Sequence, residues 1–313
     1  MKYDDFGERM KQYEKFADFK LKTKVPVAIR LDGRAFHTWT KGLNKPFDAI
    51  FYTAMQATMK SLCEEIQGCV FGYHQSDEIT LILIDYQNEN SAPWFDYRIQ
   101  KITSVAASMA TKYFNQYFEE RAMEYYQNEM IKDLEDENDE EPIMYYSPAE
   151  DEPEDEDLIE ELNEYGTVKE LSPYISTLLD KCDNGATFDA RCFNIEKDEV
   201  CNLIYWRQVD AIRNSIQAMG QSLFSHKELQ NKTQKDIKEM LLNIHNIDYD
   251  NFIPIFLQRG SACYKEEYLE SVLQTPENLP HFIVRSRWKV DLEMPLLKGE
   301  DRQYLEKLIN FKE

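Results

Sequence analysis

Two adjacent acids, Asp77 and Glu78, lie between a strand-like run, CVFGYHQS, and a strongly apolar run, ITLILID. A third acid, Asp32, is followed by Gly33 at the end of another apolar run, VPVAIRLDG. Carboxylates that converge from different strands can hold two Mg²⁺ ions about 3.5 to 4 Å apart, which neutralise a triphosphate and activate an attacking hydroxyl. Asp-Gly and Asp-Glu are also common in solvated turns. The pattern alone leaves a metal site and plain turns equally open.

The segments around these acids predict the elements that must position them. Strands are expected at 25–33, 69–76, 79–85 and 186–195, and amphipathic helices at 47–68 and 94–118. The order β-α-β-β-α-β is the ferredoxin-like unit, which predicts an α/β (α+β) palm-like fold with an antiparallel sheet and two helices on one face. Asp32 would then face Asp77 at one edge of the sheet. Gly33 has no side chain, so its backbone carbonyl could approach an ion.

Acidic residues are concentrated in one part of the chain. The formal net charge of −22 argues at first against a nucleic-acid partner, because polyanions bind basic surfaces. Residues 119–183 hold 24 acids and 4 bases, however, so the rest of the chain, with 34 acids and 32 bases, is nearly neutral. We therefore expect a palm domain at 1–118, a low-complexity acidic insertion at 119–183, and the remainder of the palm with a C-terminal helical and strand subdomain at 184–313.

The overall composition is that of a globular protein of the cytoplasm. Apolar residues make up 42% of the chain, which is enough for a substantial core. No run of about 18 apolar residues occurs, and the N-terminal stretch lacks the apolar region of a signal peptide, so neither a membrane span nor secretion is expected. The six cysteines form no C-x-x-C pair, which favours reduced thiols over disulfides or a zinc site.

Four motifs together allow a more specific prediction than composition and element order do. They are IRLDGRAFHTWTKGLNKPFD, YHQSDEITLIL, IYWRQVDAIRNSI and FSHKELQNKT, in this order along the chain. They resemble successive motifs of the tRNA-histidine guanylyltransferase family, and in particular its bacterial and archaeal-like members that repair tRNA 5′ ends. The resemblance covers residues 5–118 and 186 to about 265. It implies a palm fold that adds nucleotides in the 3′-to-5′ direction.

The resemblance also assigns roles to the acids and the loop after the first strand. Asp32 and Asp77 match the side-chain metal ligands, and Gly33 matches a position whose backbone carbonyl binds metal. Glu78 matches the acid after the second ligand, and we expect it to act in catalysis by supporting the metal site or the nucleotide. The implied nucleotide-binding residues are Asp32, Gly33, Arg34, Ala35, Phe36, His37, Lys45, Ser76 and Asp77. The implied cofactors are two Mg²⁺ ions, with ATP and GTP or another NTP as substrates.

Six further residues match positions near the tRNA: Arg207, Arg213, Asn214, His226, Lys227 and Lys232. A competing interpretation of Arg207 and Arg213 is an ion-pair pattern with Asp210 along one helix, and loop lysines are often only solvated. Eukaryotic histidine-specific members have His-Ile-Asn-Asn where this chain has IRNS at 212–215. This departure favours the repair branch over reading of the histidine anticodon. Members of the family are tetramers, so a homotetramer is expected.

The reaction implied by the resemblance has two steps. A 5′-monophosphorylated tRNA is activated with ATP, or arrives as a triphosphate, and the 3′-hydroxyl of GTP or another NTP then attacks the activated 5′ end. We expect templated repair of tRNA 5′ ends, with guanylate addition to tRNA(His) as the first alternative. A palm-fold nucleotide cyclase and a catalytically idle RNA- or partner-binding protein are two further alternatives.

Overall fold

The computed structural model describes residues 3–136, 172–272 and 281–310 of the 313-residue chain. Its centre is a six-stranded antiparallel sheet with the strand order β4-β1-β3-β2-β5-β6. The strands are β1 (Val27–Gly33), β2 (Cys69–Gln75), β3 (Glu78–Leu83), β4 (Phe188–Asn194), β5 (Ser261–Val272) and β6 (His281–Asp291). The first four strands and the helices between them form the predicted βαββαβ unit, so the predicted fold class is confirmed.

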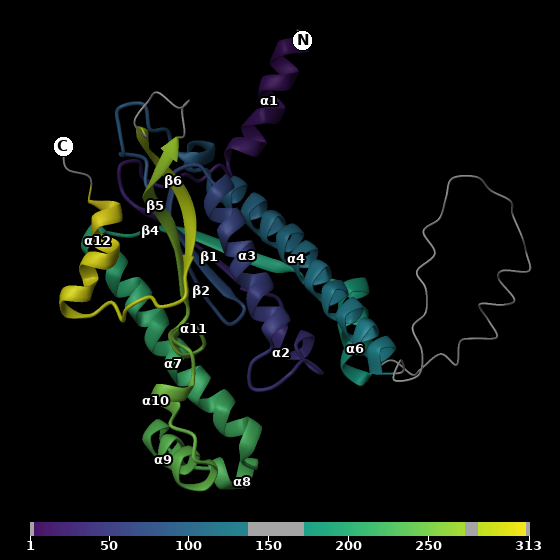
Figure 1. The fold of residues 1–313 in the computed structure, drawn as a ribbon. Coiled ribbons are helices and arrows are strands. Elements are labelled where there is room, and N and C mark those ends of the chain that lie inside the picture. Colours follow the sequence, from purple (N-terminus) through teal and green to yellow (C-terminus); the bar gives the residue numbers. More distant parts are fainter. Residues whose placement is uncertain (1–2, 137–171, 273–280, 311–313) are drawn as a thin grey trace, which may run out of the picture.

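Two helices cover one face of the sheet, as Figure 1 shows. They are α3 (Ala49–Glu65) and α4 (Ile99–Asp136), and their apolar sides pack with Val27, Ile29 and Leu31 of β1 in the largest core cluster. Helix α3 begins at Asp48, whose side chain accepts a hydrogen bond from the backbone N–H of Phe51, 2.9 Å away. A short 3₁₀ helix, η1 (Trp94–Tyr97), precedes α4. The predicted helices on this face are confirmed.

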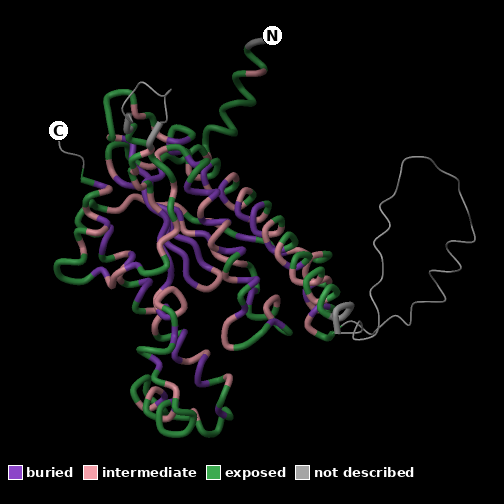
Figure 2. The backbone as a smooth tube through the Cα atoms, in the orientation of Figure 1, coloured by how far each residue is buried: buried purple, intermediate pink, exposed green. Residues whose placement is uncertain are grey.

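The opposite face of the sheet is covered as well. Helix α7 (Val200–Leu223) and the C-terminal helix α12 (Gln303–Ile309) pack there on Ala28, Phe71 and Ile82. The 3₁₀ helices η2 (Lys197–Glu199) and η3 (Gly299–Arg302) lead into them. The sheet is therefore the middle layer of three, and Figure 2 shows the burial concentrated along its strands. This explains why β2 and β3 are buried at every position rather than at alternate positions.

Four short helices follow α7: the first three lie at the end of α7 far from α12, and the fourth lies nearer the sheet and contacts β2 and β5. They are α8 (His226–Leu229), α9 (Gln234–His245), α10 (Tyr249–Phe252) and α11 (Ile255–Arg259). A third core, which includes Met219, Ile237 and Leu241, holds them to α7. Thr233 caps α9, and its side chain accepts a hydrogen bond from the backbone N–H of Asp236. The stretch FLQRGSACY at 256–264 predicts a strand, but the structure corrects its first half, because the residues up to Arg259 form α11 and the strand begins at Ser261.

The boundaries predicted for the acidic insertion were too wide. Helix α4 continues to Asp136, and a further helix, α6 (Pro173–Asn184), packs against it. Ala122 and Leu178, one from each helix, are buried in the main core cluster, so both ends of the predicted insertion belong to the body. The low-complexity acidic sequences of the predicted insertion are DLEDENDEEP and AEDEPEDEDLIEELNE, and apart from residues 133–136 they lie outside the described residues.

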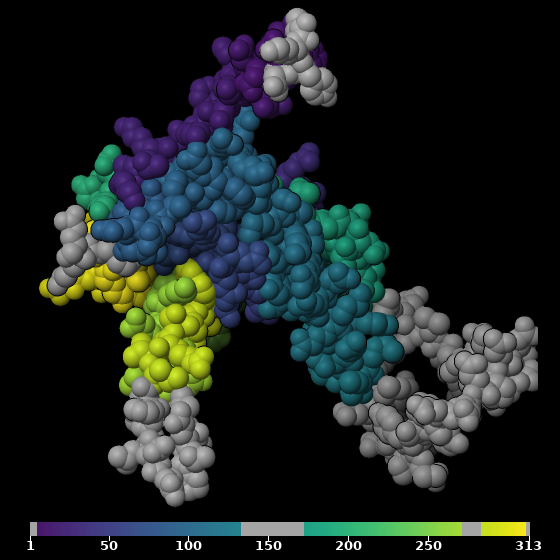
Figure 3. All heavy atoms as spheres, turned by 90° about the horizontal axis from the view of Figure 1, so that it is seen from above, coloured from purple at the N-terminus to yellow at the C-terminus, as the bar shows by residue number. Residues whose placement is uncertain are grey.

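The N-terminal helix α1 (Tyr3–Lys15) projects away from this body, as Figures 1 and 3 show. A four-residue helix, α2 (Phe36–Trp39), follows β1. Within the described parts, no helix combines the length and the apolar character needed to cross a bilayer.

Candidate active site

Asp32, near the end of β1, and Asp77, in the turn that leads into the neighbouring strand β3, lie at the same edge of the sheet. Strand β1 pairs with β3, so that Asp32 lies opposite Glu78. Asp77 belongs to the two-residue turn between β2 and β3, and its carbonyl accepts a hydrogen bond from the backbone N–H of Gly33, 3.1 Å away. The turn requires a left-handed backbone at Ser76, with φ of 51°. The strand order therefore brings the two acids together as expected.

The surroundings of Asp77 penalise its negative charge. Burial raises the pKa of its carboxyl, and the nearby charge of Asp32 raises it further. The side chain of Asp32 is 37% exposed, and the guanidinium of Arg191 is 3.9 Å from its carboxylate. A hard divalent cation between two such carboxylates would relieve their repulsion, and carboxylate oxygens are the ligands that Mg²⁺ prefers. The residues present therefore fit a magnesium site.

Such a site would depend on few protein side chains. Over residues 3–136, 172–272 and 281–310, no group of three or more His, Cys, Asp or Glu side chains is arranged to hold a metal ion. The remaining ligands would have to be backbone oxygens, substrate phosphates or water, which is the usual situation for Mg²⁺.

Glu78 has a different environment from Asp77. Its Oε1 lies 2.7 Å from Nε of Arg207, its Oε2 accepts a hydrogen bond of 2.9 Å from Nη2 of the same residue, and Arg30 lies 3.6 Å away. Both side chains of the Arg207–Glu78 pair are only 8% exposed. Burial raises the pKa of Glu78, and the two arginines oppose this shift. The carboxylate is thus engaged by protein cations and joins the hairpin to α7.

The loop after β1 is shaped by Gly33 and the aromatic ring of Phe36. A Cβ atom at position 33 would lie 2.3 Å from this ring. The ring is packed by stacking on Trp39, by an edge contact with Phe114 and by a tilted contact with Phe188, so a shift of the ring would disturb all three. Only glycine therefore fits at position 33. Phe36 is buried, and its ring is part of the core beneath the loop.

The backbone of the same loop suits an anion better than its side chains do. Ala35 adopts a left-handed conformation with φ of 56°, and helix α2 starts after it. Among the hydrogen bonds of the described residues, none uses the N–H groups of Ala35, Phe36 or His37. Arg34 and His37 are exposed beside them. Successive free N–H groups in such a turn form a concave site for phosphate oxygens.

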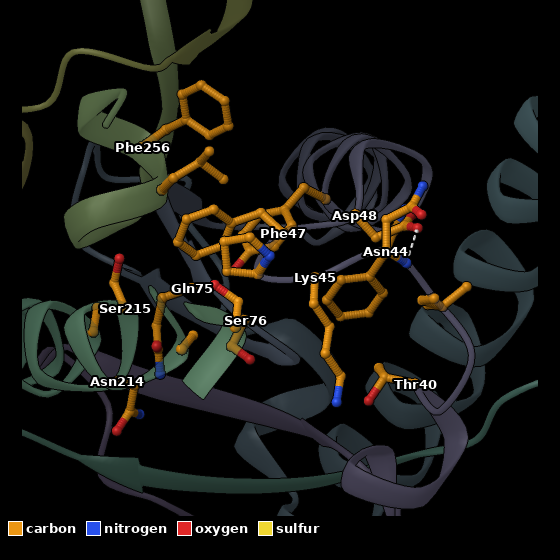
Figure 4. Close-up of a pocket in the computed structure, with 18 of the residues that line it drawn as sticks. Thr40, Asn44, Lys45, Phe47, Asp48, Gln75, Ser76, Asn214, Ser215 and Phe256 are labelled. Carbon is orange, nitrogen blue, oxygen red and sulfur yellow. Dashed lines mark hydrogen bonds between the residues drawn. The ribbon is translucent and has the colours of Figure 1, made fainter. Parts of the chain in front are cut away.

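A pocket of about 240 Å³ lies beside the Ser76-Asp77 turn. It brings together Lys45, Ser76 and Asn214, which the sequence assigned partly to the nucleotide and partly to the tRNA. Figure 4 shows Lys45 and Ser76 across from Asn214 and Ser215 of α7. Residues of the lining that sequence reasoning missed are Thr40, Asn44, Phe47, Asp48, Tyr52, Gln75, Ser215, Gln221, Ser222, Phe256 and Leu257. Its mixture of aromatic and amide or hydroxyl groups suits a nucleoside.

Asp48 fixes the loop that carries Lys45. Its carboxylate accepts hydrogen bonds from the backbone N–H of Asn44 at 3.0 Å, drawn in Figure 4, and from the hydroxyl of Tyr174 at 2.6 Å. Tyr174 belongs to α6, so an element beyond the acidic insertion stabilises the pocket. The helix cap by Asp48 can be predicted from neighbouring residues. The hydrogen bond from Tyr174 cannot, because Tyr174 is 126 residues away in sequence.

The residues predicted to contact tRNA separate into three groups. Arg207 is buried against Glu78 and Asp210, so the ion-pair interpretation is correct for it. Arg213 also pairs with Asp210, but its side chain is 59% exposed, while Asn214 lines the pocket. His226, Lys227 and Lys232 are exposed on α8 and the loop after it. The structure does not bring this last group to the acids.

Comparisons with known proteins agree with this geometry. A family model described as tRNAHis guanylyltransferase matches residues 7–141. The structure resembles a bacterial tRNA(His) guanylyltransferase-like protein in complex with ATP, with a TM-score of 0.68 and 32% identity over 97% of this chain and 99% of that chain. A bacterial structure of the same description in complex with GTP gives a TM-score of 0.64 and 30% identity over 98% of this chain and 100% of that chain.

A third relative comes from a eukaryote. The probable tRNA(His) guanylyltransferase of Dictyostelium discoideum is 24% identical over 264 residues, which are 80% of this chain and 79% of that protein. The similarity to the bacterial structures extends over nearly the whole of both chains at 30% identity or more. The chain therefore belongs to the tRNA(His) guanylyltransferase family.

Proposed function

We propose that this protein is a nucleotidyltransferase that adds nucleotides in the 3′-to-5′ direction to the 5′ end of tRNA, most consistent with templated repair. The observation that carries the proposal is the meeting of Asp32 and Asp77 beside a pocket that contains Lys45 and Ser76. Family membership supports the reaction type. The bacterial relatives in complex with ATP and GTP support these nucleotides as substrates.

The side chains have separable tasks in this proposal. Asp32, Asp77 and the carbonyl of Gly33 would hold two Mg²⁺ ions. When bound, these ions neutralise phosphate charge and lower the pKa of the attacking hydroxyl. Lys45 and Ser76 contact the triphosphate as a point charge and a hydroxyl donor, and the free N–H groups of residues 35–37 bind phosphate oxygens.

The remaining parts of the pocket position the nucleoside and the RNA. The aromatic wall, with Phe47 and Phe256, packs on the base, and the amide of Asn214 hydrogen-bonds to it or to the ribose. Arg213, His226, Lys227 and Lys232 contact tRNA phosphates from exposed positions. Arg207 acts through Glu78 by fixing the hairpin that carries Asp77. We also propose a homotetramer in the cytoplasm, which sedimentation and cell fractionation would test.

One assay tests the proposed function. The protein is incubated with Mg²⁺, ATP, labelled GTP and tRNAs with intact or shortened 5′ ends. Asp77→Asn serves as the active-site variant, and Asp250→Asn, which changes an exposed acid on α10, serves as the control. We expect Asp77→Asn to lower labelling at least about 100-fold. Labelling should persist in the control.

The melting temperature of Asp77→Asn distinguishes the loss of a metal ligand from the loss of the folded structure. The pKa of Asp77 is raised in the folded protein, so its ionised form costs stability at neutral pH, and Asp77→Asn should melt at the same or a higher temperature. Failure of the wild-type protein to label any tRNA would refute the proposed reaction. Labelling of tRNA(His) alone would instead favour specific guanylate addition over repair.

A further inference from the structure

Tyr52 is a pocket residue to which the catalytic scheme above gives no task. It lies in the first turn of α3, and its backbone N–H donates to the carbonyl of Asp48, 3.0 Å away. Its side chain lines the same pocket as Lys45 and Ser76. A tyrosine here places a hydroxyl on the aromatic wall, close to the groups that bind phosphate in the proposed function.

The ring of Tyr52 is held in one orientation by three neighbours. Its centroid lies 5.9 Å from that of Phe47, 5.5 Å from Phe51 and 5.9 Å from His74, each in an edge-on arrangement. Such contacts stabilise one position of an aromatic side chain. The hydroxyl is therefore presented at a fixed place, with little conformational entropy left to lose when a ligand binds.

The hydroxyl has no hydrogen-bond partner among the described residues. Other tyrosines in similar surroundings do have one: Tyr73 donates to the carbonyl of Arg259, Tyr174 to Asp48, and Tyr249 bonds to Ser215. Tyr52 is half-buried, and its hydroxyl is left to the pocket rather than used in a bond within the protein. Because the Tyr52 side chain lines the pocket, its free hydroxyl is available to a ligand bound there.

The charges nearby determine what kind of atom this partner is. Burial raises the pKa of Tyr52, and the negative charge of Asp77 raises it further, so the phenol keeps its proton at neutral pH and acts as a donor. Its partner must then be an acceptor. Lys45 and Ser76, which line the same pocket, make it favourable for anionic oxygens.

We propose that the Tyr52 hydroxyl donates a hydrogen bond to a phosphate oxygen of the bound nucleoside triphosphate. This rests on the proposed function, because it takes the pocket as the nucleotide site. Tyr52 is then a substrate-binding residue that adds a neutral donor to the charged contact from Lys45. It stabilises the triphosphate without adding positive charge beside the metal-binding acids.

The test compares Tyr52→Phe with the wild-type full-length protein by calorimetric titration with GTP and with guanosine, both in Mg²⁺. The substitution keeps the ring and removes only the hydroxyl. We expect affinity for GTP to fall about 5- to 10-fold and affinity for guanosine to stay the same. The melting temperature should not change, because no hydrogen bond within the described protein is lost.

Tyr117→Phe is the matched control, because it removes a hydroxyl that bonds to Ser61 between α3 and α4, away from the pocket. It should lower the melting temperature and leave GTP affinity unchanged. Equal GTP affinity of Tyr52→Phe and wild type would overturn the inference, and so would an equal loss for guanosine and GTP. A wild-type protein that binds no GTP would refute the nucleotide pocket itself, which is a distinguishable result.

Discussion

The guanidinium of Arg207 lies 2.7 Å from the carboxylate of Glu78, and both side chains are buried between helix α7 and the β2–β3 hairpin. Glu78 follows Asp77 directly and lies opposite Asp32 in the sheet. The ion pair therefore connects the second face of the protein to the turn that carries a proposed metal ligand. Its geometry explains why an arginine and an acid 129 residues apart belong to one site.

Replacing Arg207 should destabilise the protein strongly. Arg207→Met leaves the carboxylate of Glu78 buried with only Arg30 nearby, and we expect a loss of about 3 to 5 kcal/mol in the free energy of unfolding. Arg213→Met is the control, since it breaks an exposed pair with Asp210 and should cost under about 1 kcal/mol. Urea titrations measure both. Similar values for the two variants would show that the buried pair does not hold the hairpin.

Gly33→Ala should disturb the phosphate-binding loop. The added methyl group would lie 2.3 Å from the packed ring of Phe36, so the loop must move, at a cost of about 1 to 3 kcal/mol. Nucleotide affinity should fall with it, because residues 35–37 follow directly. Gly7→Ala in α1 meets no atom within 4 Å and should be neutral or stabilising by up to about 1 kcal/mol. Unaltered stability and nucleotide affinity in Gly33→Ala would contradict the role given to this glycine.

His74 should make stability depend on pH. Burial lowers the pKa of its imidazole from 6.5 to about 4, and the ring bonds as a neutral group to the carbonyl of Ser76, 2.8 Å away. Below pH 6.5 the unfolded chain binds a proton that the folded protein does not, so stability falls as pH falls, by about 2 kcal/mol between pH 6.5 and 5. The raised pKa values of Asp77 and Glu78 act in the opposite direction.

The contribution of His74 is isolated by comparison with His74→Gln. Both proteins contain Asp77 and Glu78, so the difference between their unfolding free energies at each pH reports the histidine. The wild-type advantage should shrink from pH 7.5 to pH 5. A constant advantage over this range would mean that the buried imidazole takes up a proton in the folded state.

Two exposed lysines should contribute to tRNA binding mainly through charge. Removing Lys227 and Lys232 together should weaken binding and reduce the slope of log K against log salt by up to about 2, if both contact phosphates. Lys11→Ala on α1, which removes a cation paired with Glu8, is the control and should leave the slope unchanged. Fluorescence anisotropy with labelled tRNA at several salt concentrations measures this. Identical slopes for all three proteins would place the RNA elsewhere.

Local sequence patterns were sufficient to predict the strands and the turn that hold Asp32 and Asp77. The apolar run that ends at Asp32 and the hairpin sequence around Asp77 define strand ends, and the βαββ order makes those strands neighbours. The helix cap at Thr233 is equally local, because it depends on residues within one turn.

The pocket depends on contacts that no local pattern contains. Packing of elements that are distant in sequence brings its residues together: Asn214 and Ser215 come from α7 and Phe256 from α11. Tyr174 of α6 stabilises the pocket through its hydrogen bond to Asp48. The helical spacing of Arg207, Asp210 and Arg213 predicted the ion pairs along α7, but not the pairing of Arg207 with Glu78. Arg207 meets Glu78 because α7 packs on the second face of the sheet. This packing depends on the whole fold and is not visible in a local sequence pattern.

The rings of Tyr125 in α4 and Tyr174 in α6 contact each other edge-on, with centroids 5.4 Å apart. The chain thus leaves the body and returns to it at nearly the same place, on either side of residues 137–171. Closing a loop between fixed ends costs only about 0.6 kcal/mol more for each doubling of its length. This position can therefore accept segments of very different size during evolution, and it is also where a fluorescent reporter domain can be inserted without displacing the catalytic body.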